Sequence, residues 1–73
     1  MRKDGWRLVE VKTGREVNVG EVLTDFRGKT GDVLVDAYPP RAAPSEGKVE
    51  IEGGSIYYAG VYGLRWLLEP ENV

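Results

Sequence analysis

Short stretches in which apolar and polar residues alternate dominate the chain, and glycine or proline residues separate them. Alternation with a period of two is typical of half-buried β-strands, whereas an amphipathic helix repeats every 3.6 residues. No long segment of this chain has the helical period. The pattern therefore predicts several short strands that are joined by tight turns.

Five strands are expected, and the last of them is interrupted by one short 3₁₀ turn at residues 59–63. The strands are placed at residues 6–11, 22–26, 33–38, 48–52 and 55–68. Gly53-Gly54 is expected to form a two-residue hairpin turn between the fourth and fifth strands. In the third strand the alternation predicts one face made of Val33, Val35 and Ala37.

Pairing of residues 64–68 with residues 6–11 would join the two ends of the chain and protect two strand edges. This order of elements predicts an all-β fold, a small SH3-like β-barrel of about five strands with one short 3₁₀ turn. An oligonucleotide-binding barrel is the alternative, although that fold usually has a longer helix between its middle strands. All 73 residues are expected in one domain, with a long proline-rich loop at 39–47 and a frayed tail at 69–73.

The composition excludes several kinds of chemistry. The chain has no cysteine and no histidine, which removes disulfides, thiolate nucleophiles and the commonest general base and metal ligand. Neither a membrane span nor a secretion signal is indicated, so a cytoplasmic location is expected. The net charge of −2 disfavours nucleic acid as a partner, because binding to phosphate backbones requires a surplus of cations on one face. We expect no enzyme activity, no cofactor and no metal.

Three segments of the chain resemble a group of small, mostly uncharacterised bacteriophage and prophage proteins. They are Trp6-Arg7-Leu8, Asp25-Phe26-Arg27-Gly28 and Tyr58 to Trp66, so the similarity extends over nearly the whole chain. The sequence differs from that group at Ala42-Ala43, in its middle loop. The resemblance implies a viral or mobile-element origin, with the cytoplasm of the host cell as the location, and it implies no particular reaction.

The proline-rich loop holds one candidate site for an anion. Arg41 and Lys48 could neutralise a phosphate, while Ser45 and Gly47 could supply a hydroxyl and a close backbone approach. A solvated loop stiffened by its prolines is the alternative, since Glu46 interrupts the group and no Walker-type spacing is present. The sequence Gly28-Lys29-Thr30 likewise lacks that spacing and is expected to form a hairpin turn.

Aromatic residues are numerous for a core of this size, so some of them should be exposed. Trp6, Phe26 and Trp66 are expected in the core. The tyrosines expected to bind a ligand at the surface are Tyr38, Tyr58 and Tyr62. Whether Tyr57 or Tyr58 points into the core is left open, because a shift of one residue in register would exchange them.

The predicted sheet has an acidic side. We expect it to be an ordinary solvated face, and its residues are Asp25, Asp32, Asp36, Glu50 and Glu52.

Two functions are the main hypotheses. The first is sequestration of a phosphate-bearing small ligand, for example a nucleotide signal of host defence. The second is a protein-interaction module that modulates a host or phage enzyme, and direct nucleic-acid binding ranks lowest. A homo-oligomer would add buried area to so small a domain.

Overall fold

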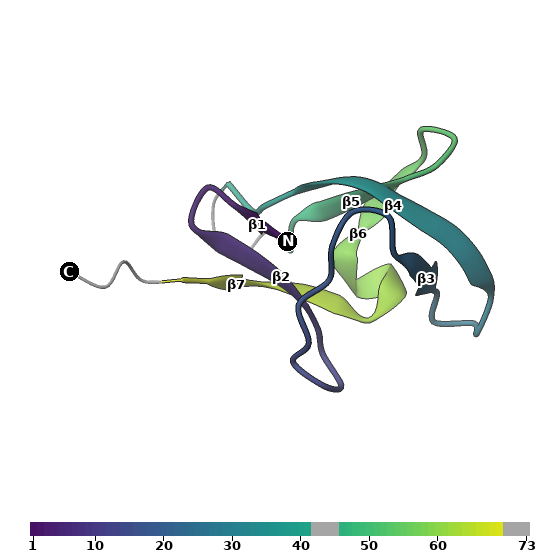
Figure 1. Ribbon diagram of the computed structural model, residues 1–73, viewed down its shortest axis with the longest axis horizontal. Coiled ribbons are helices and arrows are strands. Elements are labelled where there is room, and N and C mark those ends of the chain that lie inside the picture. The colour runs from purple at the N-terminus through teal and green to yellow at the C-terminus, as the bar shows by residue number, and fades with distance from the viewer. Residues whose placement is uncertain (42–45, 70–73) are drawn as a thin grey trace.

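The computed structural model describes residues 1–41 and 46–69, which form an all-β structure with one 3₁₀ turn (Figure 1). The elements in chain order are β1 Arg2–Lys3, β2 Trp6–Glu10, β3 Val22–Thr24, β4 Thr30–Tyr38, β5 Lys48–Ile51, β6 Ile56–Tyr58, η1 Ala59–Tyr62 and β7 Leu64–Leu68. The predicted all-β class and the 3₁₀ turn before the last strand are confirmed. No helix in the described ranges is long and apolar enough to cross a membrane.

The strands form two antiparallel sheets, one in the order β1-β2-β7 and the other in the order β3-β4-β5-β6. β2 pairs with β7 from Trp6 opposite Leu68 to Glu10 opposite Leu64, which confirms the predicted pairing of the two ends of the chain. The single closed barrel of five strands is not what the described residues form. The reason is that no strand of one sheet pairs with a strand of the other in the described ranges, and a turn at Asp4-Gly5 adds β1 as a further strand.

The segment between β2 and β3 connects the two sheets by backbone hydrogen bonds. The Val17 N–H donates to the Leu8 carbonyl at 2.9 Å, and the Gly20 N–H donates to the Leu34 carbonyl at 2.8 Å. The Leu34 N–H in turn donates to the Glu21 carbonyl at 3.0 Å. In Figure 1 this segment runs between the purple β2 and the dark blue β3. The two sheets are therefore held at a defined distance around a shared core.

The core lies between the sheets and draws residues from both of them and from η1. Its buried members are Leu8, Val17, Leu23, Leu34, Ala37, Val49, Ile51, Ala59, Tyr62, Leu64 and Trp66. Full burial of one such leucine or valine side chain contributes about 1.5–3 kcal/mol. In so small a domain these few side chains supply much of the stability.

A β-bulge in β4 overturns the predicted face of that strand. Leu34 pairs with Ile51 and Asp36 pairs with Glu50, so Val35 has no partner of its own on β5. The extra residue shifts the alternation by one position. As a result Leu34 and Ala37 are buried while Val35 is 40% exposed, so the predicted grouping of Val33, Val35 and Ala37 on one face is wrong.

The burial of the aromatic residues differs in part from the prediction that three of them fill the core. Trp66 is buried as predicted, and Trp6 packs against the core while remaining partly exposed. Phe26, however, is 72% exposed, so its predicted place in the core is wrong. Val22 and Thr24 of β3 are also exposed and Leu23 is buried. The period-two pattern of this segment is thus correct, but its single leucine, and not its phenylalanine, faces the core.

Between β5 and β6, the backbone bond from Ile51 to Ser55 closes a loop of three residues, Glu52, Gly53 and Gly54, where the sequence predicted a turn of two. The Ile51 N–H donates to the Ser55 carbonyl at 3.0 Å, and Glu50 pairs with Ile56. Gly53 and Gly54 both have a positive φ, a backbone conformation that residues with a side chain rarely adopt. The additional loop residue sets the register of β6 and places Tyr57 opposite Val49 and Tyr58 opposite Lys48.

Candidate ligand-binding site

Three exposed side chains stand in one row across the outer face of β4, β5 and β6. Tyr38 lies directly opposite Lys48, and Lys48 lies directly opposite Tyr58. Their neighbours Ala37 and Val49 are fully buried, so alternation along each strand directs Tyr38 and Lys48 to the solvent side. Residues directly opposite on antiparallel strands share a face, and this brings the two tyrosines to either side of one lysine.

Cations lie over both tyrosine rings. The Lys48 Nζ is 5.5 Å from the centre of the Tyr58 ring, and the Lys3 Nζ is 5.1 Å from the centre of the Tyr38 ring. Lys3 also forms an ion pair with the Asp36 carboxylate at 3.3 Å. Lys48 forms no ion pair with any carboxylate in residues 1–41 and 46–69. The charge of Lys48 is therefore free to meet an anion.

The acidic side chains beside this row already have internal partners. The Tyr38 hydroxyl donates to Glu50 Oε1, and this bond, assisted by desolvation, raises the pKa of Tyr38 to about 12. The Asp36 carboxylate accepts the Ala37 N–H and the Lys3 ammonium, which together hold the pKa of that carboxyl below its usual range. Both carboxylates thus serve to orient other groups of the site.

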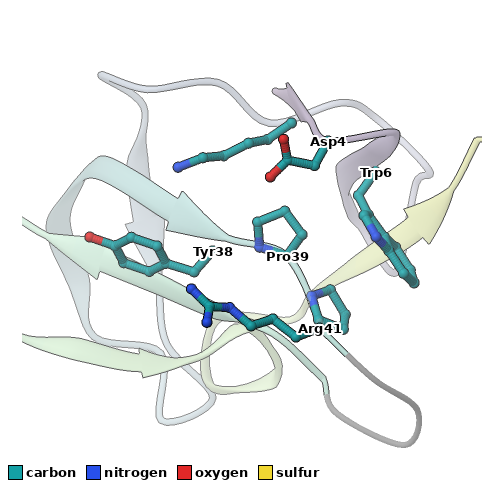
Figure 2. Close-up of a pocket in the computed structure, with 7 residues that line it drawn as sticks. Asp4, Trp6, Tyr38, Pro39 and Arg41 are labelled. Atoms are coloured by element: carbon teal, nitrogen blue, oxygen red, sulfur yellow. The ribbon is translucent and has the colours of Figure 1, made fainter.

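Two hollows adjoin the row and share Tyr38 in their walls. One, of about 620 Å³, is lined by Tyr38, Lys48, Ile56, Tyr57, Tyr58 and Val61. The other, of about 380 Å³, is lined by Lys3, Asp4, Trp6, Tyr38, Pro39, Pro40 and Arg41. In Figure 2 the Arg41 guanidinium extends toward Tyr38, whereas Trp6 stands at the opposite end of this hollow. We refer to Tyr38, Lys48 and Tyr58 with these two hollows as the tyrosine face.

The residues predicted for the anion loop have different surroundings. Arg41 is exposed beside the smaller hollow, and Lys48 belongs to the row of the tyrosine face. Ser45 lies outside the described residues. Gly47 is buried with a φ of 74°, and a Cβ at this position would lie 2.5 Å from Trp66 Cδ1 and 2.9 Å from the Tyr38 carbonyl oxygen. Close packing against Trp66 therefore explains the glycine.

Tyr62 lies beneath the surface and away from the row. It is 7% exposed, its hydroxyl donates to Asp32 Oδ2 at 2.8 Å, and its ring meets the ring of Tyr57 edge to face with the centres 6.0 Å apart. Burial, together with the bond to Asp32, raises the pKa of Tyr62 well above its ordinary value. These contacts give Tyr62 a structural role in supporting Tyr57.

Several residues of the tyrosine face were not predicted to contribute to a site. Lys3 and Ile56 reach it from β1 and β6, and Tyr57 lines the larger hollow. The pairing of β5 with β6 would have identified Ile56 and Tyr57, but it depends on the length of the loop at 52–54. Lys3 reaches the tyrosine face because of the turn at Asp4-Gly5. The residues before that turn show no alternation that would predict a strand. In the described ranges no three potential metal ligands of the His, Cys, Asp or Glu type cluster together.

Comparisons of the chain with known proteins identify no matching family model, no similar curated protein and no similar solved structure.

Proposed function

We propose that the protein is a non-catalytic binding module for a phosphate-bearing ligand with a planar ring, of which a nucleotide is the simplest example. The observation that carries this proposal is the position of Lys48 between two exposed tyrosines, without a carboxylate partner in the described ranges. Its ammonium is available for the phosphate of the ligand. The tyrosine rings are available for stacking on the ring of the ligand.

The dimensions of the tyrosine face suit such a ligand. Neighbouring strands are about 4.8 Å apart, so the backbones of Tyr38 and Tyr58, on either side of β5, are separated by roughly 10 Å. A planar ring can stack on a tyrosine within this span, and stacking of a base on an aromatic side chain contributes about 1–3 kcal/mol. Arg41 adds a second exposed cation beside Tyr38, with a planar guanidinium that suits phosphate.

The chemistry of the site supports binding without catalysis. The chain contains no histidine and no cysteine, and the Tyr38 hydroxyl is held by Glu50 with a raised pKa. Proton transfer near neutral pH usually requires a group whose pKa lies close to the working pH. Stacking and charge neutralisation need no such group, and these are the interactions that the tyrosine face offers.

We also propose that the fold is a variant of the SH3-like arrangement. The pairing of β2 with β7, the meander of β4, β5 and β6, and a 3₁₀ turn before the last strand support this assignment. A phage or prophage origin, which the sequence resemblance implies, would make sequestration of a host nucleotide signal in the host cytoplasm a suitable role.

Titration of the protein with nucleoside phosphates and cyclic dinucleotides, followed by calorimetry, tests the proposal. The matched unphosphorylated nucleosides and inorganic phosphate are titrated alongside them. We expect measurable binding only when the ring and the phosphate are in one molecule. Native mass spectrometry of protein purified from its host adds a search for a ligand that stays bound.

Two substitutions assign the binding to this face. Lys48→Gln removes the free charge and Tyr58→Leu removes the stacking surface, and each should weaken binding by about tenfold or more. Arg65→Gln is the matched control, because Arg65 is also exposed and forms no ion pair with a described carboxylate. Absence of binding by every nucleotide, or binding that Lys48→Gln leaves unchanged, would contradict the proposal.

A further inference from the structure

A second groove, separate from the tyrosine face, contains the most exposed aromatic ring of the described residues. The groove has a volume of about 660 Å³ and lies where the end of β2, the end of β3 and η1 meet. Its lining includes Val11, Lys12, Phe26 and Gly60, and it shares no lining residue with the hollow between Tyr38 and Tyr58. It therefore requires an explanation of its own.

The exposure of Phe26 is enforced by the backbone on both sides of it. The Phe26 N–H donates to the Val61 carbonyl at 2.9 Å, and Asp25 Oδ1 accepts the N–H groups of Arg27 and Lys29, each at 2.9 Å. These bonds fix the backbone of the turn and therefore the direction in which the Phe26 Cα–Cβ bond leaves it. Phe26 is 72% exposed and Val11, in the same groove, is 58% exposed. Apolar groups that are grouped and held at the surface mark interaction sites.

Some of the charged side chains beside this groove have hydrogen-bond or ion-pair partners, and others have no ion-pair partner in the described residues. The Glu10 carboxylate is occupied by Thr13 at 2.6 Å and by Arg15 at 3.2 Å, and Asp25 is occupied by the backbone of its own turn. Lys12 and Arg27, by contrast, form no ion pair with any described carboxylate, and the same holds for Lys29. The Arg27 guanidinium instead lies 5.2 Å from the centre of the Phe26 ring. Among these groups, three cations without an ion-pair partner, Lys12, Arg27 and Lys29, therefore face one such carboxylate, Asp25.

We infer that this groove docks an acidic polypeptide segment that carries one bulky apolar side chain. The apolar side chain would cover Val11 and Phe26, and the carboxylates of the segment would meet Lys12 and Arg27. A nucleic acid fits this groove less well, because it carries no aliphatic side chain that could cover the exposed Val11 beside Phe26. This interaction goes beyond the proposed ligand binding and does not depend on it.

An NMR titration of the ¹⁵N-labelled protein tests the inference directly. The probes are short peptides of glutamate and aspartate with a single leucine, isoleucine or phenylalanine, and counterparts in which lysine replaces each acidic residue. The amides of Gly28, Gly60 and Gly63 line the groove and report on it, while the amide of Tyr58 reports on the tyrosine face. We expect the acidic peptides to shift the groove amides and the lysine counterparts to leave them unchanged.

Matched variants show which residues bind the peptide. Phe26→Ser should weaken the affinity by about tenfold or more, whereas Val19→Ser, at another exposed valine outside the groove, should leave it unchanged. Lys12→Glu combined with Arg27→Glu should abolish binding, and Arg65→Glu should not.

Four results would overturn the inference. They are the absence of groove shifts with every acidic peptide, equal binding of the lysine counterparts, shifts of the same amides by an oligothymidylate, and self-association that Phe26→Ser abolishes. The last two would assign the groove to a nucleic acid and to a second copy of the chain, respectively.

Discussion

Tyr58 lies directly opposite Lys48 across the β5–β6 ladder, with the Lys48 ammonium 5.5 Å from the centre of the tyrosine ring. This relationship depends on the three-residue loop at 52–54. A two-residue turn at Gly53-Gly54 would place Tyr58 opposite Val49 and would direct its ring toward the core. The tyrosine face thus exists because the chain carries one more loop residue than the shortest hairpin needs.

The glycines of this loop should be required for stability. Gly54→Val introduces a β-branched side chain at a φ of 91°, where such residues are strongly disfavoured, and we expect a loss of about 1–2 kcal/mol in the free energy of unfolding. Ser55→Val, at the next position, should have little effect because Ser55 has no positive φ. Urea unfolding followed by tryptophan fluorescence measures both variants. Equal losses in the two variants would show that the loop conformation is not what limits the substitution.

Gly47 and Gly14 form a matched pair that separates lack of space from backbone strain. Their φ values are 74° and 73°, but a Cβ on Gly47 would contact Trp66 and the Tyr38 carbonyl, whereas a Cβ on Gly14 would meet nothing within 4 Å. We expect Gly14→Ala to cost about 1 kcal/mol and Gly47→Ala at least about 2 kcal/mol more. Chemical denaturation gives the difference, and two similar values would mean that Trp66 can move away without cost.

The bulge in β4 makes opposite predictions for two adjacent apolar residues. Leu34 is fully buried and Val35 is 40% exposed. Leu34→Ala should therefore reduce the free energy of unfolding by about 2–5 kcal/mol, and Val35→Ala by less than about 1 kcal/mol. Thermal or urea unfolding distinguishes them. A larger loss for Val35→Ala would mean that the plain alternation of the sequence holds and that the bulge is absent.

Tyr62 should make the protein sensitive to alkaline pH. Burial and the bond to Asp32 raise the pKa of Tyr62 in the folded state above the value of about 10 that it has in the unfolded chain. The neutral Tyr62 side chain therefore makes its full contribution to the free energy of unfolding below a pH of about 10. This contribution is lost as the pH rises above that value. The urea midpoint should fall above pH of about 10 in the parent protein.

Tyr62→Phe isolates this contribution. The variant should be less stable by about 1 kcal/mol at neutral pH, since the Tyr62–Asp32 hydrogen bond is gone. Its alkaline decline should be flatter, because a phenyl ring has no proton to lose, and the remaining slope reports Tyr38, whose pKa is also raised. An unchanged alkaline slope would assign the effect to other groups.

The location of every described strand except β1 could be predicted from local pattern alone. Alternating runs bounded by glycine and proline identify the segments that form β2, β5 and β7, and the Ala-Gly-Val-Tyr segment between two apolar runs predicts the 3₁₀ turn. The lack of cysteine and histidine likewise excludes disulfides, thiolate nucleophiles and imidazole groups, and this follows from the sequence alone. These properties depend on side-chain size, φ preference and spacing, all of which can be seen within a few residues.

The candidate sites depend on choices that a local pattern leaves open. The bulge at Val35 and the length of the loop at 52–54 each select between two faces of a strand, and one residue of difference reverses the result. The hydrogen bond from Phe26 to Val61 likewise fixes the turn that follows β3. Those selections are made by partners distant in the sequence, through ladder pairing and core packing. The position of most strands and of the 3₁₀ turn could therefore be predicted from the order of the amino acids. The grouping of Tyr38, Lys48 and Tyr58, and the exposure of Phe26, came from contacts between separated segments, because a period-two pattern defines two faces without saying which one is buried.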